Sequence, residues 1–519
     1  MDKHSLPRRA RSAAVADTGT GSPTASAPAA VRASGQAPGP YASGLRKWLP
    51  LVATCLGTFM LLVYATIVTV ALPSMADDLH AGFGSLQWIV DVYTLALAGL
   101  LLGMGSLSDS LGRKRLYVLG LACFTAATLV CGLAPSVQVL IAARAVQGVA
   151  GAAMFATLLP LIGLTYTGRD RPKAFAVWGA VAGAAGCAGN VAGGILTHFL
   201  SWQWIFYGAV PLCAVTLALS VKVLARDAGN PTPIDWWGVT TFTLAALSLT
   251  FAVIQGGEST WSSPATLLAF TLAAVLLAAF LLIERAIAHP MLPLSLFRKP
   301  AVNGMLIAAG VYYFSAFGFL PVLALWLHDA AGLGSLGTSL VITVQPAAFF
   351  VTCALVGSSL HRIPARWSLG GGTLVVALGN LAFLTLDPAS SWPALLPGLV
   401  LTGLGAGLVS PVLPAIAMSS APATHTGTAA AAANSARQLG LALGIALLGT
   451  VFHQHAATTA TTATTSHTAY ADALRAVFLT AGVVALAGGL AAFLLLGRHG
   501  GRTPQPPTTL SGLRRPRTP

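Results

Sequence analysis

Long apolar stretches separated by short polar segments make up most of this chain. The first runs from Trp48 to Leu72, and about thirteen further stretches of similar length follow it. A helix of roughly 20 apolar residues can cross the hydrocarbon core of a bilayer, and it satisfies its own backbone hydrogen bonds there. The pattern therefore predicts an all-α integral membrane protein with about fourteen transmembrane helices. After the first, the predicted helices are 86–106, 116–133, 137–165, 174–196, 205–225, 236–256, 264–284, 301–327, 336–357, 368–386, 394–418, 428–452 and 473–497.

Three segments depart from this pattern. Residues 1–45 are rich in Ala, Ser, Pro, Gly and Thr, and residues 500–519 are rich in Pro and Arg, so both are predicted to be disordered tails. Residues 456–470 are a run of Thr, Ala, Ser and His, which predicts a flexible loop. Pro73 is expected to close the first helix, because proline cannot donate a backbone hydrogen bond.

Composition narrows the class of protein further. Of the 519 residues, 55% are hydrophobic and only 8% are charged, which excludes an ordinary soluble globular protein. The 6 cysteines all lie in apolar stretches and lack the spacing of metal ligands, so they are expected to serve in packing, and no metal site is predicted. No phosphate-binding loop follows a strand-like stretch. The sequence therefore predicts neither an enzyme nor a bound cofactor.

The net charge of +14 would suggest a nucleic-acid partner in a soluble chain. Here, however, 25 of the 28 Lys and Arg residues fall in the tails and in alternate loops, on one side of the predicted membrane. Cytoplasmic loops of membrane proteins carry such an excess of cations. We therefore expect a multi-pass protein of the inner cell membrane with both termini in the cytoplasm and no nucleic-acid partner.

One polar stretch between two predicted helices is unusually dense in charge. It runs from Gly105 to Arg115 and reads Gly-Ser-Leu-Ser-Asp-Ser-Leu-Gly-Arg-Lys-Arg. Gly112 would allow a tight reversal of the chain. Asp109 is placed to accept hydrogen bonds from Arg113 or from the end of a neighbouring helix. We expect Asp109 and Arg113 to take part in closing the inner side of the molecule.

Three ions lie inside predicted membrane helices, where an uncompensated charge costs roughly 2.5–3.5 kcal/mol. Asp91 is a candidate site for a proton or a cationic substrate, or else an interfacial residue exposed to water. Arg144 shares a helix face with Gln147, which indicates either a role in proton relay and gating or a buried hydrogen-bond hub. Arg437 is a further gating candidate, with the alternative that it only holds helices together through backbone carbonyls.

Small and aromatic residues supply the remaining candidates. Glycines recur on one face of the predicted helix 174–196, which permits close packing against a neighbour and either sliding or static contact. These glycines are Gly183, Gly186, Gly189, Gly193 and Gly194. The candidates for lining a substrate cavity are Tyr64, Tyr93, Asn190, Tyr312 and Asn434.

Taken together, these residues resemble the fourteen-span drug:proton antiporters of the major facilitator superfamily. The resemblance rests on the Gly105–Arg115 stretch, on Arg144 with Gln147 and Gly148, and on the glycines of the predicted helix 174–196. It also includes Arg437 with the residues that follow it. It implies two six-helix halves, residues 46–226 and 300–499, joined by two extra helices within 227–299. The chain departs from the family pattern at Tyr64, where an aspartate is usual.

The resemblance implies a secondary active transporter that exports lipophilic drugs or secondary metabolites in exchange for protons. Its expected partners are a small lipophilic substrate, protons and membrane lipid; it would act as a monomer, with the proton gradient as its energy source. Without an acid at Tyr64, Asp91 is left to bind the proton, with Arg144 tuning it, and a neutral or acidic substrate is favoured over a dication. The alternatives are an uncoupled facilitator or importer of the same fold and a non-transporting membrane sensor.

Overall fold

The computed structural model describes most of the chain between Leu45 and Gly497. The predicted tails, residues 1–45 and 500–519, lie outside the described residues except for Leu45. The helices from Leu49 onward belong to one compact unit that begins at Lys47. The described residues are 45–168, 170–227, 229, 233–356, 363–385, 392–420, 426–459 and 463–497.

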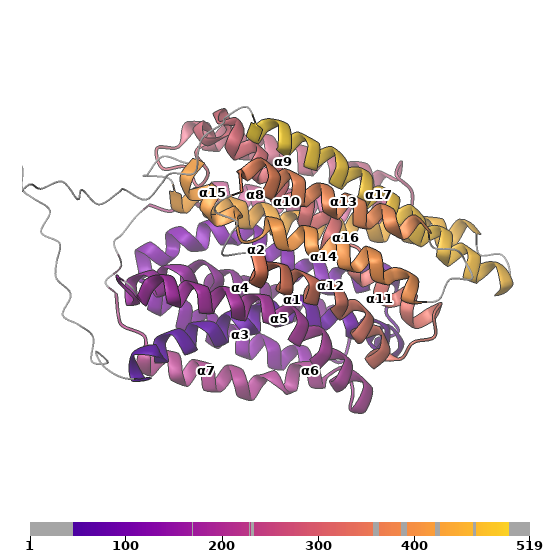
Figure 1. Cartoon of the computed structure of the whole chain (residues 1–519), viewed down its shortest axis with the longest axis horizontal. Coiled ribbons are helices and arrows are strands. Elements are labelled where there is room, and N and C mark those ends of the chain that lie inside the picture. The colour runs from indigo at the N-terminus through magenta and orange to yellow at the C-terminus, as the bar shows by residue number, and fades with distance from the viewer. Residues whose placement is uncertain are drawn as a thin grey trace, which may run out of the picture. The chain divides into compact units, whose positions relative to one another are not determined.

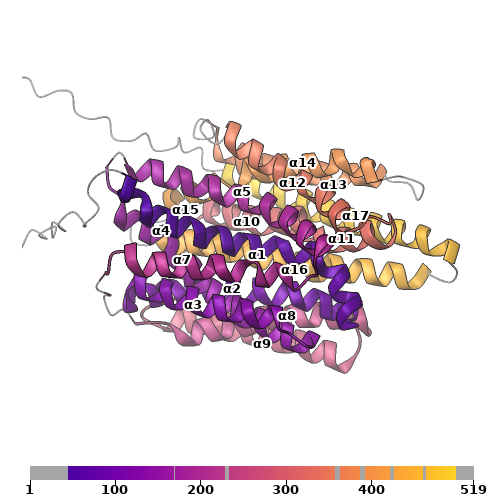
Figure 2. The ribbon, with the colours of Figure 1, turned by 90° about the horizontal axis from the view of Figure 1, so that it is seen from below.

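Every regular element in these ranges is a helix, and within the compact unit the long helices run alongside one another (Figures 1 and 2). The first are η1 (Leu45–Trp48), α1 (Leu49–Leu79), α2 (Phe83–Leu111), α3 (Arg113–Gly132), α4 (Val137–Thr165), α5 (Asp170–Phe199), α6 (Trp204–Tyr207), α7 (Ala209–Val223), α8 (Trp236–Glu258) and α9 (Pro264–Ala286). After them come η2 (Leu294–Arg298), α10 (Pro300–Phe317), α11 (Leu320–Asp329), α12 (Ser335–Val356), η4 (Arg366–Gly371), α13 (Gly372–Ala382), η5 (Phe383–Thr385), η6 (Trp392–Leu395), α14 (Leu396–Val409), α15 (Leu413–Ser420), α16 (Thr426–Thr459) and α17 (Ala463–Gly497).

The described residues contain 14 helical stretches that are long and apolar enough to cross a membrane. Most are single helices, whereas α6 with α7, and α10 with α11, together make one stretch each. This number, and the helical character of every described element, confirm the predicted all-α membrane fold.

Hydrogen bonds between loops define two ends of the helical unit. The end that holds Gly105–Arg115, here called the loop end, also holds the end of α7, because Lys114 Nζ donates to the Leu224 carbonyl at 2.6 Å. At the opposite end, here called the far end, Trp202 Nε1 donates to Asp78 Oδ2 at 2.8 Å. Successive spans therefore alternate in direction between these two ends.

The helix pair α8–α9 packs against the rest of the unit through α8. This helix contacts α2 and α16, while α9 packs mainly on α8 (Figure 2). Glycine makes the approach to α2 close: a Cβ atom placed on Gly103 would lie 2.5 Å from Val239 Cγ2, and one on Gly99 would lie 2.6 Å from Thr243 Oγ1. A larger side chain at either glycine would force α8 away from α2.

The prediction that Pro73 ends the first helix is wrong. The α1 helix passes through Pro73 and continues to Leu79, and it ends at His80, whose φ of 48° is left-handed. Proline removes a single backbone donor, and membrane helices tolerate this where neighbouring helices pack around the site. Pro73 is buried in this way.

Two predicted helices are interrupted in the structure. The stretch 301–327 breaks between α10 and α11, and the stretch 394–418 breaks between α14 and α15. The second segment in each case carries a proline in its first turns, Pro321 in α11 and Pro414 in α15. Proline has no backbone N–H and cannot donate to the carbonyl four residues earlier, so each break lies where the helical ladder lacks a hydrogen bond.

The predicted flexible loop at 456–470 is also wrong for its described residues. The α16 helix runs to Thr459 and α17 begins at Ala463, so most of this segment is helical. Both helices therefore continue past the apolar stretches that the hydropathy pattern detects.

Candidate functional site

The Gly105–Arg115 stretch is mostly helical: α2 continues past its predicted end to Leu111, the chain turns at Gly112, and α3 begins at Arg113. Gly112 has a φ of 92°, a conformation that favours glycine. Arg113 Nη2 donates to Asp109 Oδ1 at 2.9 Å, which is one of the two contacts the sequence predicted for Asp109. The Asp109 side chain is 51% exposed, and such a surface ion pair stabilises little by itself. The pair spans the turn between α2 and α3, and its part in closing the loop end stays a prediction.

A second carboxylate, which the sequence analysis missed, holds this turn in place. Asp227, in the segment after α7, accepts from the backbone N–H of Arg113 at 2.8 Å and of Lys114 at 3.2 Å. These are unpaired donors of the first turn of α3, where a negative charge is favourable. Asp227 directly follows Arg226 at the end of a span, but only the fold shows which helix it caps.

Arg144 is the centre of a buried hydrogen-bond cluster. Its side chain is 1% exposed; Nε donates to the Ile89 carbonyl at 3.0 Å and Nη2 to the Tyr64 carbonyl at 3.4 Å. Nη1 donates to Gln147 Oε1 at 2.6 Å, and the guanidinium lies 4.3 Å from the centre of the Tyr93 ring. Arg144 therefore joins α1, α2 and α4, which is the hydrogen-bond hub that the sequence left open. A role in proton relay stays a prediction.

Asp91 is fully buried, with an exposed fraction of 0%, and neither of its carboxylate oxygens has a hydrogen-bond partner. This excludes the alternative that it is exposed to water in this conformation. It also does not meet Arg144. Tyr93, whose ring lies under Arg144, is two residues further along α2 and about 200° away around the helix. The structure thus places the carboxyl group of Asp91 and the guanidinium group of Arg144 on different sides of α2.

The face of α2 that carries Asp91 meets α8 and α16. One turn before Asp91, Gln87 Nε2 donates to two backbone carbonyls of α16 at 3.0 and 3.2 Å. One turn after it, Leu95 clusters with Ala246 of α8 and Ala442 of α16. Asp91 therefore lies at an apolar junction between α2, α16 and the linking helix α8. We call the spans from α1 to α7 the early spans and those from α10 to α17 the late spans.

Arg437 lies on α16 and bonds to side chains rather than to backbone carbonyls. Nη1 donates to Asn434 Oδ1 at 3.2 Å, Nη2 donates to Tyr313 Oη, and the guanidinium lies 4.5 Å from the centre of the Tyr313 ring. Its Nε is buried without a partner. Tyr313 packs against the apolar core of the first spans and against that of α10 and α16, so this cluster lies where early and late spans meet.

The predicted cavity residues divide into two groups. Tyr64, Tyr93, Asn190 and Tyr312 are at most 1% exposed, and the Tyr64 and Tyr93 hydroxyls donate to backbone carbonyls of α6 and α1. Asn434 is partly exposed beside Arg437. In this conformation the first group is engaged in helix packing, and a role for any of the five in lining a cavity stays a prediction.

The glycine face of α5 lies against α1 and α12. A Cβ atom placed on Gly189 would lie 2.3 Å from a side chain of α1, and one on Gly194 would lie 2.0 Å from a side chain of α12. The close packing expected from the sequence is therefore present, while sliding stays a prediction. The nearest residues are Thr66 for Gly189, Ile67 for Gly193, Phe350 for Gly183, Pro346 for Gly186 and Ser339 for Gly194.

Early and late spans are joined at the far end. Phe83, at the start of α2, stacks with Phe452 of α16 at 6.3 Å between ring centres, and Gly194 packs on Ser339 near the far end of α5. The α1 helix also contacts α11. These contacts close the far end between the two groups of spans.

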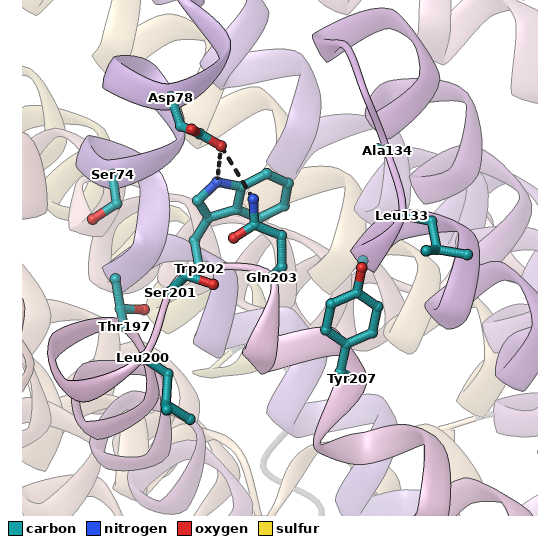
Figure 3. Close-up of a pocket in the computed structure, with 11 residues that line it drawn as sticks. Ser74, Asp78, Leu133, Ala134, Thr197, Leu200, Ser201, Trp202, Gln203 and Tyr207 are labelled. Atoms are coloured by element: carbon teal, nitrogen blue, oxygen red, sulfur yellow. Dashed lines mark hydrogen bonds between the residues drawn. The ribbon is translucent and has the colours of Figure 1, made fainter.

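A cavity of about 730 Å³ opens at the far end, within the first spans (Figure 3). Asp78 lies on its wall and accepts hydrogen bonds from Trp202 at 2.8 Å and Gln203 at 3.1 Å, while Tyr207 faces it from α6. None of the predicted site residues lines it. The cavity is therefore a feature of the far-end loops and is separate from the polar clusters deeper in the unit.

The sequence matches the Major Facilitator Superfamily over residues 54–298 and 305–518. The chain belongs to the major facilitator superfamily. This membership confirms the predicted family, whose members are transporters and not enzymes. The 14 spans are those of its fourteen-span type.

Several relatives in this superfamily are named for resistance or export. The multidrug resistance protein Stp of Mycobacterium tuberculosis is 33% identical over 78% of this chain and 75% of its own length. The puromycin resistance protein pur8 of Streptomyces alboniger is 34% identical over 78% of this chain and 82% of its own. The cephamycin export protein CmcT of Amycolatopsis lactamdurans is 35% identical over 77% of this chain and 84% of its own.

A solved structure shares the fold of this superfamily member. The auto-inhibited POT family peptide transporter matches 86% of this chain and 96% of its own with a TM-score of 0.65, at 15% sequence identity. At that identity the likeness concerns the fold alone.

Proposed function

We propose that this superfamily member exports small lipophilic, antibiotic-like molecules from the cytoplasm in exchange for protons. The relatives named for multidrug resistance, puromycin resistance and cephamycin export support the efflux of such compounds. The proton gradient would be the only energy source. We expect a monomer surrounded by lipid to be the working unit.

The distribution of charge supports an orientation. The cations Lys47, Lys114, Lys173 and Arg226 lie at the loop end or in the segments that meet there, whereas Asp78 lies at the far end. Because cytoplasmic loops carry the excess of cations, the loop end faces the cytoplasm and both termini lie there. The described conformation is then closed toward the outside and ready to take substrate from within.

The burial of Asp91 without a hydrogen-bond partner is the observation that supports proton coupling. Within the described part of the chain neither of its carboxylate oxygens has a hydrogen-bond donor, and burying a bare carboxylate among apolar side chains costs several kcal/mol. Asp91 also lies where early and late spans meet, so a change in their contact would alter its access to water. Proton binding favours the described conformation, and release follows when α2 separates from α16.

The Arg437 cluster supports the substrate class. A partly exposed cation with no carboxylate among its described partners, beside an aromatic ring, suits a neutral or acidic aromatic compound. A dication would meet the charge of Arg437, whose described partners include no carboxylate to offset it. We therefore expect acidic or neutral compounds to be preferred over dications.

Efflux from cells or inverted vesicles tests the coupling. We expect Asp91→Asn to lower proton-driven efflux of lipophilic fluorescent compounds by about tenfold or more, and Asp91→Glu to retain part of it. Asp77→Asn, which removes an exposed acid, is the matched control and should export as the native chain does. Efflux that persists both in Asp91→Asn and after a protonophore collapses the gradient would leave an uncoupled facilitator.

A further inference from the structure

Two acidic side chains meet inside the linking helix pair. Asp235 directly precedes α8, and Glu284 lies in the last turn of α9, so the packing of α8 on α9 brings both to the loop end. Each residue is only 4% exposed. Their carboxyl groups lie close together, because a Cβ atom placed on Gly238 would lie 2.3 Å from Asp235 Oδ2 and 3.0 Å from Glu284 Oε1.

One oxygen of each carboxyl group is satisfied by the backbone. Asp235 Oδ1 accepts from the Gly238 N–H at 2.7 Å and so caps α8, while Glu284 Oε2 accepts from the Leu292 N–H at 3.1 Å. The other two oxygens, Asp235 Oδ2 and Glu284 Oε1, are buried and have no donor. Two ionised carboxylates close together repel each other, and both lose their hydration on burial. A single proton between them removes the repulsion and gives each oxygen its partner.

The charged side chains near this pair are exposed to solvent or bonded elsewhere. A proton is therefore the simplest ligand that the two carboxyl groups could share. Arg285, His289, Arg298 and Lys299 follow Glu284 in the chain, and all four side chains are exposed. On α2, the helix that packs against α8, the titratable group toward the loop end is Asp109, which is exposed and bonded to Arg113. Among the described residues, the hydrogen bonds to these two carboxyl groups come from the backbone N–H groups of Gly238 and Leu292.

We propose that Asp235 and Glu284 form a proton-binding site that holds one shared proton and fastens α9 and the following loop to the start of α8. Glu284 binds the Leu292 N–H, and this loop leads through η2 into α10, which carries Tyr313. Loss of the proton would leave two charges facing each other and loosen the connection between α9 and α10. The site is independent of the proposed transport function.

Thermal unfolding of the full chain in detergent tests the proposal. Because folding takes up the shared proton, stability is highest at low pH and falls as the pH rises past the point where the pair loses it. We therefore expect the native midpoint to fall between about pH 5 and about pH 9, relative to Glu284→Gln. The amide of Glu284→Gln donates to Asp235 Oδ2 and keeps the Leu292 contact without a titratable proton.

Asp235→Asn is the second variant, since its amide can donate to Glu284 Oε1 and still cap α8. Asp77→Asn, an exposed acid, should keep the native pH dependence. In the infrared spectrum, the native protein at low pH should show a protonated-carboxyl band that Glu284→Gln lacks. Native-like pH dependence in both Glu284→Gln and Asp235→Asn overturns the proposal. So does a native midpoint that depends on sodium concentration instead of pH.

Discussion

The two arginines inside the spans have different surroundings and therefore different expected roles. Arg144 is satisfied by the carbonyls of Ile89 and Tyr64 and by Gln147, all buried. Among the described residues, the hydrogen-bond partners of Arg437 are the side chains of Asn434 and Tyr313, and its Nε has no partner. The first arginine thus completes a closed cluster, whereas the second has hydrogen-bonding capacity left for a ligand.

Substitution by lysine should separate these two residues. Lysine keeps the charge but lacks the planar fork of donors, so Arg144→Lys leaves buried acceptors unsatisfied and should cost about 2–3 kcal/mol of stability. Arg437→Lys should cost less than about 1 kcal/mol and instead lower the efflux of acidic compounds relative to neutral ones. Unfolding midpoints and efflux of a matched acid and its amide would check both. Equal losses of stability in the two variants would contradict this distinction.

At the scale of elements, α5 shows how a helix face without side chains sets the distance to its neighbours. Gly189 meets Thr66 of α1 and Gly194 meets Ser339 of α12, whereas nothing lies within 4 Å of a Cβ atom placed on Gly179 in the same helix. Glycine therefore allows close helix contact at positions 189 and 194, whereas position 179 has room for a larger side chain.

Alanine substitutions in α5 should show this difference. Gly189→Ala forces α1 and α5 apart, and overpacking of this kind costs about 1–3 kcal/mol and should also reduce efflux. Gly179→Ala is the matched control, and because alanine favours helix over glycine it should stabilise by up to about 1 kcal/mol. Unfolding midpoints of the two variants provide the measurement. A Gly189→Ala chain as stable and active as Gly179→Ala would show that the close contact is unimportant.

At the scale of the whole molecule, transport by alternating access requires early and late spans to separate where they are now joined. The contact of α5 with α12 is one of these joints. A Cβ atom placed on Gly186 would lie 3.5 Å from Pro346 Cβ, which is a Cβ–Cβ distance that a disulfide can span. A bond there would hold the two helices in the described arrangement.

A double cysteine variant tests this movement. After replacement of the 6 native cysteines, Gly186→Cys with Pro346→Cys should cross-link under mild oxidation and lose efflux, and a reductant should restore it. Gly179→Cys with Pro346→Cys, about two helix turns away, should not cross-link. Full efflux by the cross-linked protein would rule out separation of α5 from α12 during transport.

Local sequence determined more than the number of spans. The apolar stretches set fourteen membrane helices because each must satisfy its own backbone within lipid. Short spacing in the sequence also pointed to correct contacts: Asp109 is hydrogen bonded to Arg113, four residues away, and Arg144 is hydrogen bonded to Gln147, which shares its helix face. Pro73 misled the prediction because its effect depends on the helices around it.

Contacts between helices were decided only by the tertiary structure. The sequence shows which residues share a face, but not which helix that face meets, because helix packing depends on side chains brought together from distant parts of the chain. It therefore could not show that Asp91 faces away from Arg144, that Asp227 caps α3, or that Asp235 and Glu284 are buried close together. The sequence alone determined a membrane protein of fourteen helices with a charged turn and three intramembrane ions. The tertiary structure decided which of these ions have hydrogen-bond partners, because the position of each partner is set by the packing of other helices.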